Sequence, residues 1–174
     1  MKRFALALGC AVAGLLLAPA AAQDLNIIND PGAPQVQGAS GRLRDDPGVQ
    51  GGKALRVAVR SKGANAWDVA VQTPITQPVK AGDKLLLAFW VRLEKGEGGA
   101  TTATLPYNAV QQSAAPFTAL FSGAAEINPE WKLHEVRGTA AADHGAGTLN
   151  ATIHLANAAQ TVDLGPIFVV NLGQ

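Results

Sequence analysis

The sequence contains one cysteine, Cys10, and one methionine, Met1. Both lie in an N-terminal segment with the pattern of a cleaved export signal. The mature domain is therefore expected to have no disulfide, no thiol nucleophile and no thiolate metal site. Its stability must then come from packing one hydrophobic core, which a single domain of about 150 residues can supply.

The N-terminal segment has the three parts of a signal peptide. Lys2 and Arg3 form a basic start, residues 4–17 are an apolar run, and Ala20 to Ala22 form a small-residue cleavage site. The apolar run is shorter than the roughly 20 residues that span a bilayer. We expect residues 1–23 to be a signal peptide that is cut before Gln23 or Asp24.

A lipid anchor at Cys10 is the alternative, but Ala7-Leu8-Gly9 before it is a poor lipobox. No second hydrophobic segment follows that could cross a membrane. Residues 24–174 are thus expected to form one soluble domain, periplasmic or secreted.

The sequence also lacks an excess of charge of either sign. Without Lys2 and Arg3, 12 basic side chains face 13 acidic ones, a formal net charge of −1, and no basic stripe is present. This distribution disfavours nucleic acid as a partner.

What the sequence does contain is repeated two-residue periodicity. Leu55, Val57 and Val59 alternate with polar or small residues, and residues 84–93 are apolar on both faces. No stretch has a convincing helical period. Strands are expected at residues 25–28, 55–60, 67–71, 84–93, 100–105, 110–112, 118–121, 130–137, 147–155 and 161–172, with an irregular connection up to residue 52. Short strands separated by turn residues predict an all-β, two-sheet antiparallel sandwich.

The late strand over residues 148–155 has a polar outward row. Asn150, Thr152 and His154 alternate with inward-facing aliphatic residues. Asn150-Ala151-Thr152 also satisfies the N-glycosylation sequon, a pattern that is common by chance.

Several motifs occur in a characteristic order. They are residues 51–57 (GGKALRV), 67–69 (WDV), 79–83 (VKAGD), 89–92 (FWVR), 116–117 (PF), 130–132 (EWK) and 160–166 (QTVDLGP). In this order they resemble the carbohydrate-binding modules attached to xylanases and related glycoside hydrolases, over roughly residues 51–173. The resemblance implies a galactose-binding-like jelly roll that holds a sugar chain on a concave sheet face or its rim. It further implies a non-catalytic role beside a glycoside hydrolase.

The same resemblance bears on metal. Members often carry an acidic residue in the last strand that helps to hold a structural calcium. Here the matching position is Gly165, with Asp163 two residues earlier. No cofactor is therefore expected, and the missing acidic residue argues against a structural calcium.

Sugar binding needs aromatic faces and converging hydrogen-bonding groups. Trp67 begins a strand, so it could stack on sugar at the rim or fill the core with Val69 and Val71. Trp90 lies on the outer face of the longest strand, where it could form the floor of a cleft or be covered by the N-terminal segment. Trp131 is expected to pack in the core with Leu133.

Polar candidates lie between the tryptophans and after them. Amide side chains both donate and accept hydrogen bonds, which suits sugar hydroxyls, and a nearby aromatic could stack. The alternatives are a solvated loop and an ordinary exposed histidine. The candidate sugar-binding residues, besides Trp67 and Trp90, are Gln72, Tyr107, Asn108, Gln111, Gln112, Phe117 and His154.

Metal and catalytic interpretations find less support. His134, His144 and His154 are ten residues apart, which matches no compact metal motif. No pair of acidic residues stands out for glycoside hydrolysis, and no serine nucleophile motif is present. We therefore expect no enzyme activity and no metal site.

Three functional hypotheses remain. The first is a secreted or periplasmic non-catalytic domain that binds polysaccharide or oligosaccharide and assists a separate glycoside hydrolase. The second is an envelope structural or protein-interaction domain that has lost sugar binding, which the low aromatic content of 5% favours. The third, a small hydrolase or lyase, lacks any acid–base constellation.

Overall fold

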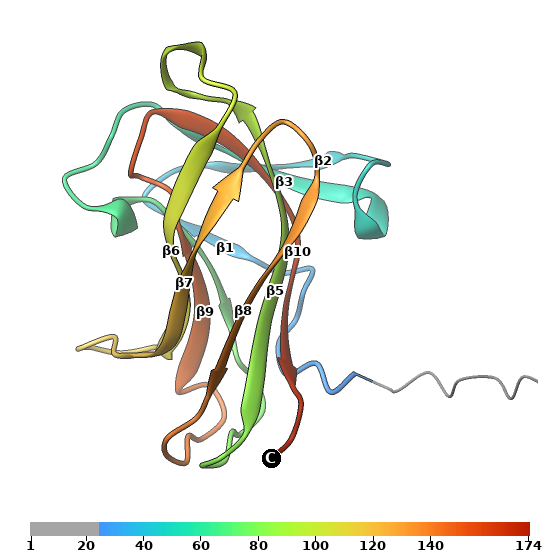
Figure 1. Cartoon of the computed structure of the whole chain (residues 1–174), viewed down its shortest axis with the longest axis vertical. Coiled ribbons are helices and arrows are strands. Elements are labelled where there is room, and N and C mark those ends of the chain that lie inside the picture. Colours follow the sequence, from blue (N-terminus) through green and yellow to red (C-terminus); the bar gives the residue numbers. More distant parts are fainter. Residues whose placement is uncertain (1–24) are drawn as a thin grey trace, which may run out of the picture.

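The computed structural model describes residues 25–174, so the expected signal peptide lies outside the described residues. Within residues 25–174 ten strands form two antiparallel five-stranded sheets, with only three short 3-10 turns as helix. The sheets lie face to face (Figure 1). This confirms the predicted all-β sandwich. None of the helices in this range is long and apolar enough to cross a membrane.

The two sheets are named after their central strands. In the β9 sheet the order is β1 (Gln35–Gln37), β4 (Ala70–Pro74), β9 (Leu149–His154), β6 (Ala103–Gln112) and β7 (Ala119–Ile127). In the β10 sheet the order is β2 (Gly41–Asp45), β3 (Lys53–Val59), β10 (Gln160–Asn171), β5 (Lys84–Lys95) and β8 (Lys132–Thr139). Each sheet thus combines strands from both halves of the chain.

Some strand predictions are wrong at their boundaries. β1 and β2 lie within the stretch predicted to be irregular. Sequence periodicity does not reveal them, because exposed edge strands carry no strong apolar alternation. Residues 25–28 form no strand, only an isolated bridge between Ile27 and Val170. The expected strands at 100–105 and 110–112 are one strand, β6, interrupted by a bulge between Leu105 and Asn108.

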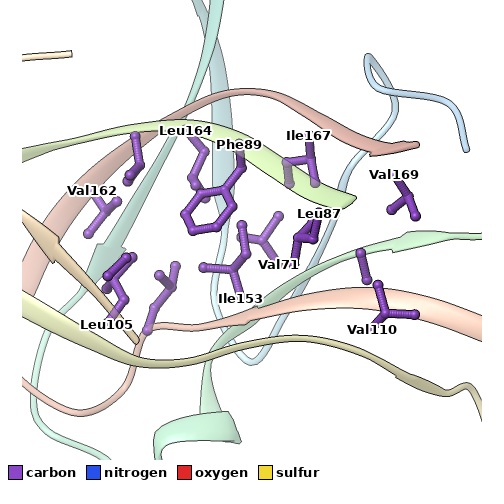
Figure 2. Close-up of a cluster of buried hydrophobic side chains, with 14 of the residues drawn as sticks. Val71, Leu87, Phe89, Leu105, Val110, Ile153, Val162, Leu164, Ile167 and Val169 are labelled. Atoms are coloured by element: carbon purple, nitrogen blue, oxygen red, sulfur yellow. The ribbon is translucent and has the colours of Figure 1, made fainter. Parts of the chain in front are cut away.

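The core lies between the sheets, where the inward rows of both meet (Figure 2). Phe89 of β5 is fully buried at its centre, with Leu87 from the same strand and Val71 and Ile153 from the opposite sheet. The inward rows come from period-two alternation, so the core follows directly from the sequence pattern.

Asn29 joins the two sheets at one side of the sandwich. Its side-chain amide donates to the carbonyl of Ile167 (2.8 Å) and to the hydroxyl of Thr73 (3.2 Å), and its oxygen accepts from the amide of Val169 (2.7 Å). The side chain therefore replaces a neighbouring strand along β10 and reaches β4 as well. Buried polar groups of this kind are tolerated only when they are satisfied in this way.

The outer face of the β10 sheet is held together by ion pairs around Asp163. This fully buried carboxylate accepts hydrogen bonds from Arg44, Arg56 and Arg92 at 2.7–3.1 Å. Burial alone would raise the pKa of Asp163, but the hydrogen bonds from Arg56 and Arg92 outweigh it and hold the pKa below its usual value. Three surrounding guanidinium groups make Asp163 an unsuitable ligand for calcium.

Trp131 lies at this surface rather than in the core, so its predicted core role is wrong. The guanidinium of Arg92 lies 5.0 Å from the centre of its ring, in a cation–π arrangement. Its expected partner Leu133 is 43% exposed. The two apolar residues that suggested a core position belong to the sheet's outer side.

His134 lies on β8, the edge strand of the β10 sheet, and faces the interior of the sandwich. Its ring stacks on Phe89 with centroids 5.8 Å apart, and its Nε2 is buried without a hydrogen-bond partner. Burial, with a smaller contribution from Lys132, lowers the pKa of His134 below its ordinary value. The neutral imidazole is therefore the form that the folded protein accommodates.

This environment predicts a pH-dependent stability. Because the unfolded chain takes up the proton first, the stability contributed by neutral His134 is complete above pH 6.5 and is lost as the pH falls through the lower folded value. We expect the melting temperature to fall less steeply between pH 7 and pH 5 in His134→Phe than in the wild type. Parallel slopes in a calorimetric pH series would contradict the assignment.

Candidate functional site

The outer face of the β9 sheet carries a polar floor. In β9 every residue is buried, yet only the inward row is aliphatic. Thr152 pairs with Gln72 of β4 and His154 pairs with Ala70, so these residues face outward together. The outward row of β9 is polar, so the side chains that bury it belong to neighbouring residues on the same face and not to a second hydrophobic core.

Three rings form a wall at one end of this floor. Tyr107 stacks on His154 with centroids 4.5 Å apart and planes 23° from parallel. Trp67 meets His154 edge-on at 6.3 Å, and 58% of Trp67 remains exposed. These geometries are the favourable ones for aromatic pairs, so each ring helps to fix the next. The exposed ring of Trp67 is left available for a ligand.

Trp67 is held by a turn and not by a strand. It lies in the 3-10 turn η2 (Ala66–Asp68), where the carboxylate of Asp68 accepts from the backbone amide of Asn65 at 2.9 Å. β4 begins only at Ala70, so the prediction that Trp67 starts the strand is wrong. Of the two roles left open for Trp67, its exposure excludes filling the core.

Tyr107 reaches the floor because of the bulge in β6. Leu105 pairs with Ala125 and Asn108 pairs with Gly123, so two residues of β6 lie opposite Ala124 alone. Both of these residues, Pro106 and Tyr107, line the outer face. Without the bulge, regular alternation would direct one of the two into the core.

Phe117 approaches from the β6–β7 connection. It is 52% exposed and its φ of 56° lies in the left-handed region, which non-glycine residues seldom adopt. Together with the floor and the ring wall it encloses a cavity of about 610 Å³, which we name the cleft. The cleft is lined by Gln37, Ala66, Trp67, Gln72, Pro106, Tyr107, Gln111, Pro116, Phe117 and His154.

A row of amides crosses the floor from strand to strand. Asn150 Nδ2 donates to Gln72 Oε1 (3.1 Å), and Gln72 Nε2 donates to Gln37 Oε1 (3.0 Å). On the other side the Tyr107 hydroxyl donates to Gln111 Oε1 (3.1 Å). These bonds orient the amides and leave further donors and acceptors available to a polar ligand.

The cleft is electrically neutral. None of its described lining residues is an acid, a lysine or an arginine. Burial lowers the pKa of His154 and raises the pKa of Tyr107, so both are uncharged at neutral pH. The site therefore offers ring faces, amides, one imidazole and one phenol, without the paired carboxylates that glycoside hydrolysis requires.

Most of the sequence candidates meet in the cleft. Trp67, Gln72, Tyr107, Gln111, Phe117 and His154 all line it, although they come from four separate segments of the chain.

The other three candidates lie elsewhere. Trp90 is half-buried on the outer face of the β10 sheet, where its Nε1 donates to Gln50 (3.1 Å). Of its two predicted roles, cover by the N-terminal segment is therefore the one that the structure supports. Asn108 is fully buried, and its amide nitrogen donates to the carbonyls of Leu105 and Gly123. Gln112 pairs with Leu149 and so shares the inner face. These positions do not reach the cleft.

Sequence reasoning missed Gln37 and Asn150 as contributors to the site. Gln37 was hidden in a segment expected to be irregular. The sequence pattern places Asn150 and Thr152 on the outward row of β9. The hydrogen bond from Asn150 to Gln72 connects that row to the lining of the cleft. Asn150 Oδ1 and Thr152 Oγ1 are buried without hydrogen-bond partners in residues 25–174.

No protein-family model matches the chain, and no curated protein matches it. Solved structures do. The second N-terminal cellulose-binding domain of Cellulomonas fimi β-1,4-glucanase C is 16% identical, with a TM-score of 0.63 over 89% of this chain and 100% of that one. The CBM22-1 xylan-binding domain from Paenibacillus barcinonensis Xyn10C is 15% identical, with a TM-score of 0.58 over 88% and 99%.

A solved CBM4 structure is 17% identical, with a TM-score of 0.60 over 78% of this chain and 92% of that one. The chain has the fold of a carbohydrate-binding module. This agrees with the resemblance seen in the motif order. At these identities the shared carbohydrate-binding-module fold does not specify a ligand, which must be argued from the cleft itself.

The turn that carries Trp67 depends on Gly38. A Cβ at Gly38 would lie 1.7 Å from the carbonyl oxygen of Asp68, and its φ of 75° is left-handed. Gly38→Ala should therefore lower the free energy of unfolding by about 2–3 kcal/mol. Gly98→Ala is the control, because Gly98 has a φ of 61° but no atom within 4 Å of its Cβ position, and it should lose only about 1 kcal/mol. Equal losses in denaturant titrations would show that the contact with Asp68 is unimportant.

Proposed function

We propose that this protein is a non-catalytic domain that binds polysaccharide or oligosaccharide in the cleft. The observation that carries the proposal is the meeting of Trp67, Phe117 and a row of amides in one neutral cavity. Aromatic faces pack against the C–H faces of pyranose rings, and amides pair with the hydroxyls at the ring edges. The fold shared with carbohydrate-binding modules supports the same function.

The scarcity of aromatic residues no longer favours a structural role. Although aromatics make up only 5% of the chain, Trp67, Tyr107 and Phe117 all line the cleft. A domain that had lost sugar binding would have no need to keep exposed rings beside a polar floor. Single exposed apolar residues are ordinary, but apolar groups gathered around one concave surface are typical of a binding site.

The affinity should be modest. Individual aromatic contacts contribute about 1 kcal/mol each beyond the area that they bury. Together with that burial and the hydrogen bonds of the amides, a few such contacts should give a dissociation constant roughly in the millimolar to micromolar range. A domain of this kind would tether a separate glycoside hydrolase to its substrate or capture oligosaccharides. The export pattern of residues 1–23 supports a periplasmic or secreted location for this role.

Removal of the exposed ring of Trp67 should weaken this binding. Trp67→Ala is expected to weaken glycan affinity about tenfold, because one stacking contact of about 1.4 kcal/mol is lost. Affinity electrophoresis against xylan, glucan and mannan gels measures the effect. Melting should change little, since Trp67 is 58% exposed.

Leu133→Ala is the matched control for Trp67→Ala. Leu133 is a large side chain, 43% exposed, on the opposite sheet. Its removal should leave retardation unchanged. Wild-type protein that is retarded by no glycan, or retardation equally reduced in both variants, would contradict the proposal.

Binding should also depend on pH through His154. The residues that face it, Ala70 from β4, Tyr107 from β6 and Trp67 from the turn, carry no charge that could stabilise an imidazolium. Burial already lowers its pKa, and a bound sugar would bury it further. Affinity should therefore be constant above pH 6.5 and fall at lower pH, once His154 becomes protonated.

His154→Gln, which does not titrate, should show a flatter pH profile in isothermal titration calorimetry between pH 4.5 and 8, values chosen to bracket the ordinary histidine pKa of about 6.5. A wild-type profile as flat as that of the variant would exclude His154 from the binding site.

A further inference from the structure

A second cavity of about 730 Å³ lies at the side of the sandwich, where β3 extends beyond its neighbour β2. Arg60 and Ser61 line it from the end of β3, and Gly38 and Ser40 line it from the β1–β2 connection. We name it the Arg60 cavity. It shares no lining residue with the cleft and contains none of its rings.

The two cavities share a wall nonetheless. Gln37 lines the cleft and the next residue, Gly38, lines the Arg60 cavity; in the same way Trp67 lines the first and Val69 the second. Between these residues, the backbone at Gly38 packs so closely against Asp68 that a Cβ would overlap the Asp68 carbonyl. Because residues one and two positions apart line the two cavities, an oligosaccharide of several units is long enough to reach from the cleft to the Arg60 cavity.

Arg60 differs from the three arginines that surround Asp163. Arg44, Arg56 and Arg92 all form ion pairs with Asp163, whereas within residues 25–174 Arg60 forms no ion pair. No acidic residue lines the Arg60 cavity among the described residues. Arg60 is exposed, and two residues with hydroxyl groups, Ser40 and Ser61, line the same cavity.

We propose that the Arg60 cavity binds the carboxylate of an acidic sugar unit in the same glycan whose uncharged units occupy the cleft. A guanidinium matches the two oxygens of a carboxylate, and serine hydroxyls can donate to the same group. The neutral cleft has no cation of its own, so recognition of acidic units is assigned to Arg60. This inference rests on the proposed glycan binding in the cleft.

The test compares matched oligosaccharides that differ only in charge. One pair is a xylo-oligosaccharide with and without a glucuronic acid branch, and the other is a cello-oligosaccharide with and without oxidation at C6. The pair whose neutral member binds is used for calorimetry with wild type, Arg60→Gln and Arg42→Gln. Arg42 is the control because it is an exposed arginine on β2 that lines neither cavity.

Wild type should bind the acidic member about threefold to fivefold more tightly than the neutral one at low salt, and less so as salt is raised. Arg60→Gln should remove this preference and leave neutral binding unchanged, while Arg42→Gln should retain it. Equal binding of both members by wild type, or the same loss in both variants, would overturn the Arg60 assignment alone. Failure of wild type to bind either neutral member would overturn the cleft function and this inference with it.

Discussion

The register of β9 between β4 and β6 is the constraint on which the site depends. In this register Ile153 and Ala151 complete the core while Thr152 and His154 form the floor of the cleft. Because side chains alternate along a strand, a shift by one residue would place the polar row in the core and the aliphatic row outside. The core and the cleft therefore both depend on how β9 pairs with β4 and β6, and a change of this register would alter both.

The outer faces of the two sheets use polar groups in different ways. On the β10 sheet, Asp163 and its three arginines satisfy one another, and Trp131 is covered by Arg92. On the β9 sheet, the amides are bonded in a line but retain free donors and acceptors, and Trp67 is uncovered. The first arrangement stabilises the fold and the second leaves hydrogen-bonding capacity for a partner.

The sequence predicted the sandwich because its core strands alternate strongly, as in residues 149–155. It also selected most of the cleft, and the outward row of residues 148–155 placed His154 correctly. It failed where local geometry breaks the alternation. The bulge in β6 turned Tyr107 outward and left Asn108 buried, and no period in the sequence marks a bulge. Trp90 was ambiguous because an apolar outer face can be either a ligand surface or a covered one.

The position of β10 has a consequence for how the molecule is made. This strand follows all the others in sequence, yet it lies in the middle of its sheet, between β3 and β5. Asn29, near the opposite end of the described chain, contacts it across a separation of 140 residues. Until β10 has emerged from the ribosome, the sheet is in two unpaired halves and the core is open on one side. The native β10 sheet therefore forms only after β10 has been synthesised, and folding should be slow for a domain of this size because its decisive contacts are so distant along the chain.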